Sequence, residues 1–342
     1  MALPLSFAAN WAGASAIRDS DENHYRPTGK GWGEIDLSRS NTQNNNAADP
    51  FNSNAQDSEL FSGNLNENDG GSTNRYTRGN GNATGFARKS RVPAATNGIT
   101  YHGGPVMLGN TNVYYIWYGN WAGNTATTIL TDLAKSIGAT PHFNINTTYY
   151  NASNTHVSNA VSYITSTTDN YSQGKALSDA QIQAVVSNAI SSGNLPKDSN
   201  AVYFVLTAAD VNATSGFCTQ YCGWHTHASM GGTDIKYSFV GNPARCPNSC
   251  AAQTIGPNGN AAADGMASVL AHELEEAVTD PDLNAWYDAK GYENADKCAW
   301  TFGAMYTVGN GAKANMKLGG RDYLIQQNWV NANGGVCAQQ YP

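Results

Sequence analysis

The chain has 342 residues, of which 40% are hydrophobic and only 13% charged, and its net charge is −7 at pH 7. No Lys/Arg run exceeds the pair Arg88-Lys89, which excludes nucleic acid as a main partner because phosphate binding needs concentrated positive charge. No window approaches the roughly 18 to 20 continuous apolar residues of a membrane-spanning helix, so the sequence predicts no membrane span.

Residues 1–98 are predicted to be an extended, low-complexity Asn/Gly-rich segment. Between 21 and 98 only 18 of 78 residues are hydrophobic, too few to offset the entropy of ordering the segment by itself. Its apolar start, Ala2 to Trp11, can add a strand to another copy of the chain. We therefore expect residues 1–98 to act as an assembly arm that makes a homo-oligomer or a filament.

Residues 99–342 are predicted to form a globular α/β domain with an irregular, disulfide-pinned C-terminal region. Runs of apolar, β-branched and aromatic residues predict strands at 112–118, 201–207 and 235–240, with a late strand near 323–327. Helical spacing of apolar residues predicts a helix at 124–137 that Asn124 can cap, a second that Ser178 can cap, and a third at 264–278 that Asp264 caps. The order of these elements is compatible with a zincin-like mixed sheet and an active-site helix.

Six cysteines predict three disulfides and hence an oxidising, extracellular compartment: Cys218, Cys222, Cys246, Cys250, Cys298 and Cys337. We expect Cys298 and Cys337 to pair, whereas the two C-x3-C pairs can close internally or cross-pair. A zinc site in those two pairs is the alternative. Five N-x-S/T sequons fit secretion and N-linked glycans: Asn82, Asn146, Asn151, Asn170 and Asn212.

The sharpest chemical motif is the run from His272 to Glu276, with sequence H-E-L-E-E. His272 and Glu276 are four apart and share a helix face, so both can bind one zinc ion. Glu273 would then be the general base that deprotonates metal-bound water, as in H-E-x-x-H hydrolases. The alternative is an amphipathic helix whose polar face happens to carry these residues.

Further ligands can come from His225 and His227, whose side chains point the same way if their segment is extended. Two solvent-exposed histidines on a loop are the alternative. An acidic set follows the last predicted helix and suits Ca²⁺, or could complete a zinc shell through Glu293 or Asp296: Asp280, Asp282, Asp288, Glu293 and Asp296. Acidic residues in exposed turns and caps are the alternative for most of the set. A cluster of aromatic residues could stack on sugars or belong to the core: Tyr114, Tyr115, Trp117, Tyr118 and Trp121.

Several segments together resemble the Exordium or phosphate-induced protein family of secreted plant proteins. They are Tyr101–Val106, Ile116–Trp121, Gly216–Cys218 with Cys222-Gly223, Cys246-Pro247 with Cys250, Asp264–Met266, Ala277–Pro281 and Tyr323-Leu324. The resemblance covers about 100–337 and implies an extracellular, wall- or matrix-associated protein linked to growth, with no settled catalytic activity. Plant members carry apolar or small residues at the positions of His272, Glu273 and Glu276, whereas distant microbial relatives retain the H-E pair.

Three functional hypotheses follow. The first is a structural or adhesive glycoprotein of the cell surface or matrix, self-assembling, with a structural or vestigial metal site and with wall polysaccharide as a further partner. The second is a secreted zinc-dependent hydrolase, most naturally a peptidase. The third is a carbohydrate-binding module.

Overall fold

The computed structural model describes residues 16–18, 25–27 and 98–342. The short strands β1 (Ala16–Arg18) and β2 (Tyr25–Pro27) pair in antiparallel register. Most of the predicted assembly arm, including Ala2 to Trp11 and the sequon at Asn82, falls outside the described residues. Its role in self-assembly therefore stays a prediction.

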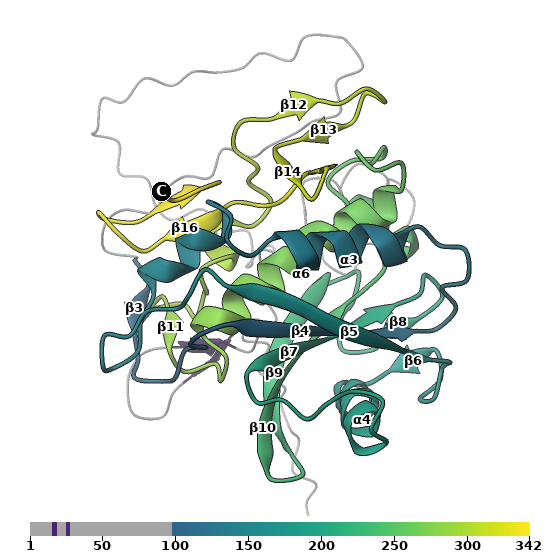
Figure 1. Ribbon diagram of the computed structural model, residues 1–342, viewed down its shortest axis with the longest axis horizontal. Helices are drawn as coiled ribbons and strands as arrows, with labels where there is room; N and C mark the ends of the chain where they lie inside the picture. The colour runs from purple at the N-terminus through teal and green to yellow at the C-terminus, as the bar shows by residue number, and fades with distance from the viewer. Residues whose placement is uncertain (1–15, 19–24, 28–97) are drawn as a thin grey trace, which may run out of the picture. The chain divides into compact units, whose positions relative to one another are not determined.

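A five-stranded mixed sheet runs through the domain in the order β5-β4-β7-β10-β9 (Figure 1). Its strands are β4 (Thr111–Tyr118), β5 (Val161–Asp169), β7 (Ala201–Thr207), β9 (Gly223–Met230) and β10 (Thr233–Val240). The pairs β4/β5, β4/β7 and β7/β10 are parallel, and β9 is antiparallel to β10 at one edge. The predicted mixed α/β class is confirmed, and the finer zincin-like prediction stays a prediction.

Helices cover both faces of this sheet, which explains why β4 and β7 are apolar on both sides. Helices α3 (Ala126–Ser136) and α6 (Ala261–Thr279) lie on one face, and α4 (Asp179–Ser191) lies on the other (Figure 1). The aromatic residues of β4 and the turn after it are at most 7% exposed. These rings, from Tyr114 to Trp121, form core and not the sugar-stacking platform that the sequence suggested.

The ends of the helices test the predicted caps. Ser178 caps α4 as predicted, in a reciprocal capping box with Gln181. The prediction of Asp264 as the cap of α6 is wrong, because Asn260 takes that position and accepts a hydrogen bond from the backbone N–H of Ala263. Similarly, α3 has Thr125 at its N-cap, while the preceding Asn124 accepts from the N–H of Ala126.

Short elements make up the rest of the domain. The 3-10 helices are η2 (Phe143–Thr148), η3 (Pro243–Arg245) and η4 (Asp296–Cys298), and α5 (Pro247–Cys250) is a single turn. The two-stranded sheets are β3 (Thr100–Tyr101) with β11 (Trp286–Tyr287), β6 (Ala176–Leu177) with β8 (Asn212–Ala213), β12 (Tyr306–Thr307) with β13 (Lys313–Ala314), β14 (Met316–Leu318) with β15 (Arg321–Tyr323), and β16 (Asn328–Val330) with β17 (Val336–Ala338). The prediction of a late strand at 323–327 is wrong, because β15 ends at Tyr323, residues 324–327 belong to no strand, and β16 begins at Asn328.

All six cysteines form disulfides, as predicted. Cys298 pairs with Cys337 and pins the C-terminal region, whereas the two C-x3-C pairs cross-pair as Cys218–Cys246 and Cys222–Cys250. The alternative of a zinc site in these cysteines is therefore excluded. Among the described residues, no helix is long and apolar enough to cross a membrane.

Candidate metal centre

Helix α6 is buried along almost its whole length, because every residue from Ala263 to Thr279 is shielded from solvent. Five of these residues are ionisable: Asp264 lies in the first turn, and the other four, His272, Glu273, Glu275 and Glu276, stand within one turn and a half. Burying a charged group without a partner is very costly. The polar groups around this helix must therefore compensate one another or hold a cation.

One group of donors forms around His272. Its Nε2 lies 3.1 Å from Oε1 of Glu276, one turn along the helix, and 3.6 Å from Oδ1 of Asp296. The backbone N–H of Asp296 donates to the same Oε1 of Glu276, which fixes η4 against α6. The shared helix face of His272 and Glu276 is as predicted, and Asp296 joins them.

A second group forms where β9 passes beside the same helix. Nε2 of His225 lies 3.1 Å from Oε1 of Glu293 and 3.8 Å from Oε2 of Glu276. In each group the three donor atoms lie within 4.8 Å of one another. The structure therefore gathers four of the predicted ligands, His225, His272, Glu276 and Glu293, from segments far apart in the sequence.

The electrostatics of this cluster suit a cation. Burial raises the pKa of Glu276, and the neighbouring charge of Asp296 raises it further. Burial also lowers the pKa of His225 to about 4, which keeps its imidazole neutral and able to bind a metal. Oε2 of Glu276 and Oδ1 of Asp296 accept no hydrogen bond from the described residues. Imidazole and carboxylate donors together fit zinc or a similar transition ion better than calcium, which prefers oxygen ligands only.

His227 does not join this cluster, although it follows His225 on the same strand. Its Nδ1 lies 2.7 Å from Asp234 and 3.6 Å from Asp282, and Nζ of Lys236 lies 2.6 Å from Asp234. His227 and Asp234 are more than one-third exposed. Because the Lys236 ammonium already supplies positive charge to these carboxylates, the group is a surface ion-pair network.

The remaining acidic residues do not gather into a calcium loop. The Asp280 carboxylate accepts the N–H groups of Asn284 and Ala285, each at 2.6 Å, and burial raises its pKa to about 7. The Asp288 carboxylate accepts two backbone N–H groups and pairs with Lys297. The Ca²⁺ prediction for this set is therefore wrong, since its members serve separate turns and clusters.

The predicted base Glu273 is fully buried and faces the start of β9. A Cβ added at Gly223 would lie 3.0 Å from Oε1 of Glu273 and 2.6 Å from Cγ1 of Val269. Gly223 thus lets the strand that carries His225 approach α6 closely. The sequence offered no signal for this approach beyond the glycine itself.

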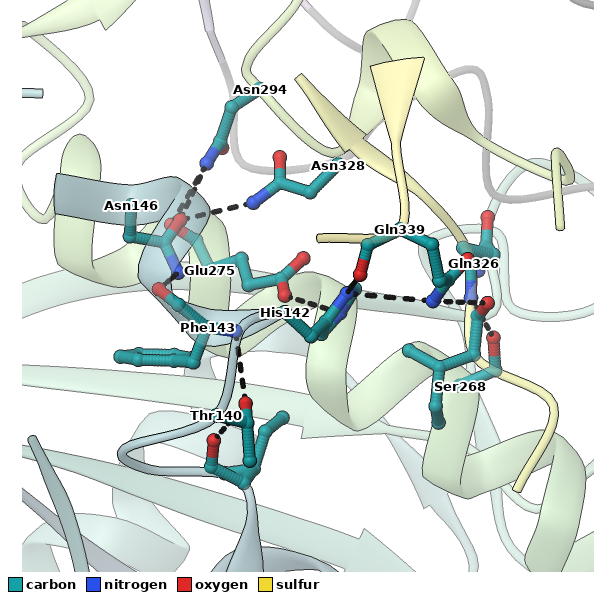
Figure 2. A network of polar contacts seen from close by, with 12 residues as sticks. Thr140, His142, Phe143, Asn146, Ser268, Glu275, Asn294, Gln326, Asn328 and Gln339 are labelled. Carbon is teal, nitrogen blue, oxygen red and sulfur yellow. Dashed lines mark hydrogen bonds and ion pairs between the residues drawn. The ribbon is translucent and has the colours of Figure 1, made fainter. Parts of the chain in front are cut away.

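On another side of α6, Glu275 forms a network that no pattern in the sequence indicates. Its Oε1 lies 2.7 Å from Nε2 of His142, whose Nδ1 lies 2.9 Å from the carbonyl oxygen of Gln339 (Figure 2). Burial by itself lowers the pKa of His142, but the Glu275 charge and these contacts raise it above its ordinary value overall. The network therefore ties the C-terminal segment to α6 through a buried ion pair.

Asn146 belongs to the same region and is fully buried. Its side-chain oxygen accepts hydrogen bonds from Asn294 and Asn328, and its amide nitrogen donates to the carbonyl oxygen of Phe143 (Figure 2). A glycan at Asn146 is therefore incompatible with this fold. Asn170 is exposed and Asn151 and Asn212 are partly exposed, so glycans there stay predictions.

Comparisons with known proteins identify a family to which the chain is similar. The family model described as "Phosphate-induced protein 1 conserved region" matches residues 99–329. Protein EXORDIUM-like 3 of Arabidopsis thaliana is 33% identical over 271 residues, which are 68% of this chain and 80% of the relative. Protein EXORDIUM-like 5 of the same plant is 32% identical over 282 residues, 70% of this chain and 77% of the relative. Protein PHOSPHATE-INDUCED 1 of Nicotiana tabacum is 28% identical over 223 residues, 56% of this chain and 68% of the relative. No solved structure matches the chain significantly.

Proposed function

The chain belongs to the phosphate-induced protein 1, or Exordium, family, and from this premise we propose that it is a secreted protein built around a buried divalent-metal centre that stabilises the domain. One observation carries the proposal. Two histidines and three carboxylates from β9, α6 and the 293–296 segment converge in the interior. The five are His225, His272, Glu276, Glu293 and Asp296.

Burial supports a structural role for this centre. Each of the five ligand side chains is at most 2% exposed. Structural zinc sites are filled by protein ligands, whereas catalytic sites keep one coordination position open to substrate, and side chains this deeply buried suit the structural class. A cation here would link three segments that are otherwise far apart along the chain, and binding free energy of that kind adds to folding free energy.

Metal analysis of the purified full-length chain tests the proposal. We expect zinc or a similar transition ion to copurify at one equivalent per chain or more, and His272→Ala to lower the metal content. His227→Ala is the matched control, because it removes a histidine from the same strand as His225 but outside the cluster. A folded wild-type protein that contains no metal and binds no added Zn²⁺ would overturn the proposal.

Secretion and a matrix role belong to the same proposal. Three disulfides support an oxidising compartment, and the accessible sequons are compatible with glycans. Self-assembly through residues 1–98 and binding of wall polysaccharide stay predictions. Light scattering on the full chain tests the first of these, since a monomer at high concentration would end the assembly hypothesis.

A second candidate, a secreted zinc-dependent hydrolase of the zincin-like class, is favoured by the H-E pair on α6. Glu273 follows the ligand His272, and an antiparallel edge strand runs beside that helix. For this function, Glu273→Gln should retain the metal but lose peptide hydrolysis, measured on a mixture of fluorogenic peptides. Equal hydrolysis by wild type and variant would remove Glu273 as the base.

A further inference from the structure

Glu276 divides its carboxylate between the two histidines of the cluster. Its Oε1 lies 3.1 Å from Nε2 of His272, and its Oε2 lies 3.8 Å from Nε2 of His225. Each histidine then has a second carboxylate of its own: Asp296 for His272 and Glu293 for His225. The donors thus form two trios, each with one histidine, and Glu276 is the residue that both share. The His225 trio includes Glu293, and the His272 trio includes Asp296.

The spacing within each trio matches a single metal ion. Ligand atoms bound at about 2.0–2.2 Å to a tetrahedral zinc ion lie about 3.4 Å from one another. The four histidine-to-carboxylate distances are 3.1 and 3.8 Å in the His225 trio and 3.1 and 3.6 Å in the His272 trio. The donor separations in each trio are therefore close to those of three ligands in one coordination shell.

Two further observations indicate that each trio binds a cation. The oxygens that accept no hydrogen bond from the described residues are Oε2 of Glu276 and Oδ1 of Asp296, one facing each histidine, on side chains that are at most 2% exposed. In addition, three carboxyl groups lie in the interior, those of Glu276, Glu293 and Asp296, and one divalent cation balances only two carboxylates. Buried charge of this size needs compensation.

We propose that the cluster holds two divalent ions bridged by the Glu276 carboxylate. One ion is bound by His225 and Glu293, and the other by His272 and Asp296. Carboxylate-bridged pairs of ions about 3.5–4 Å apart are an established arrangement in metalloproteins. This inference rests on the proposed metal-binding function and adds its stoichiometry and its bridging residue.

Stoichiometry separates this inference from the function on which it rests. The folded full-length chain is loaded with Zn²⁺ alone, dialysed exhaustively and analysed for zinc and protein. Two equivalents per chain are expected. One equivalent overturns the bridged pair and leaves the proposed function standing, and none overturns both.

Variants locate the two ions. His225→Ala and His272→Ala should each retain one equivalent, and the matched control His227→Ala should retain two. If His227→Ala retains only one, the second ion sits at His227, Asp234 and Asp282 and the bridged pair is overturned. Manganese loading provides a test that needs no variant, because a bridged Mn²⁺ pair gives an exchange-coupled paramagnetic resonance spectrum. An uncoupled six-line spectrum at two equivalents would overturn the inference.

Discussion

Burial acts on His142 and His225 in the same direction, yet their pKa values move in opposite directions. Both side chains are inaccessible to solvent, and for both the largest effect is desolvation, which disfavours the charged ring. For His142 the Glu275 carboxylate at 2.7 Å and the contact with the Gln339 carbonyl together outweigh burial, so its pKa is raised. For His225 the attraction to Glu276 does not offset burial and the repulsion from His272 and His227, so its pKa is lowered and its ring stays neutral. One buried histidine is therefore suited to an ion pair and the other to a metal.

The His142 ion pair should make stability depend on pH. The folded-state pKa of His142 is raised above its unfolded value of about 6.5, so its contribution is complete below pH 6.5 and is lost as pH rises through the folded pKa. We expect His142→Gln to lower the unfolding free energy by about 3 to 5 kcal/mol at pH 6, because Glu275 is left buried without its partner. Guanidinium unfolding at pH 6 and pH 9 should show a smaller deficit at the higher pH.

The control for this prediction is His156→Gln, which removes an exposed imidazole that contacts the carbonyl oxygen of Thr147. Its cost should stay near 1 kcal/mol or below. A deficit for His142→Gln that is the same at both pH values would show that the imidazolium form contributes nothing.

At the scale of elements, α6 organises the interior because its polar residues face different neighbours. His272 and Glu276 face β9 and the 293–296 segment, and Glu275 faces η2 and the C-terminal segment. Glu293 lies just before η4 and Asp296 begins it, and Cys298 at the end of η4 is fixed by the disulfide to Cys337. A disulfide therefore fixes the loop that supplies two of the proposed ligands.

Removing this disulfide should affect both stability and metal binding. The double variant Cys298→Ala/Cys337→Ala opens a loop of 39 residues, and loop-closure entropy gives an expected loss of about 4 kcal/mol. We also expect weaker zinc affinity, because Asp296 and Glu293 lose their anchor. Chemical unfolding and competition with a zinc-binding dye measure the two effects.

The matched control is Cys218→Ala/Cys246→Ala, which opens a loop of 28 residues and should cost a similar free energy. Removing that disulfide should leave the 293–296 segment in place, because neither cysteine belongs to it. An equal loss of zinc affinity in both double variants would contradict a specific role for Cys298–Cys337.

At the scale of the whole domain, the proposed metal centre would join the sheet edge, the buried helix and the 293–296 segment. Removing the ions should therefore lower the unfolding midpoint of the chain. A metal present at 1,000 times its dissociation constant adds about 4 kcal/mol to stability. We expect a chelator such as dipicolinate to lower the midpoint in calorimetry, and added Zn²⁺ to restore it. The double variant His225→Ala/His272→Ala should be insensitive to the chelator, and a wild-type midpoint that the chelator leaves unchanged would contradict the structural role.

Local sequence patterns determined the class of the domain and several of its elements. The apolar run 201–207 predicts β7 at its observed bounds, Ser178 predicts the start of α4, and six cysteines predict three disulfides. Each of these signals is contained within a few residues or in a simple count. The motif His272 to Glu276 likewise placed two ligands on one helix face, because that relation depends only on helical geometry.

Tertiary structure alone decided the rest. Strand β5 is rich in Ser and Thr and gave no apolar signal, and the pairing of the C-x3-C cysteines was open in sequence. Asn146 looked like a glycan acceptor until packing buried it beside Asn294 and Asn328. The division of Glu276 between His225 and His272, and the contact of Glu275 with His142, join residues up to 133 positions apart. Such contacts leave no local periodicity, because they depend on how separate elements pack and on which buried charges must compensate one another.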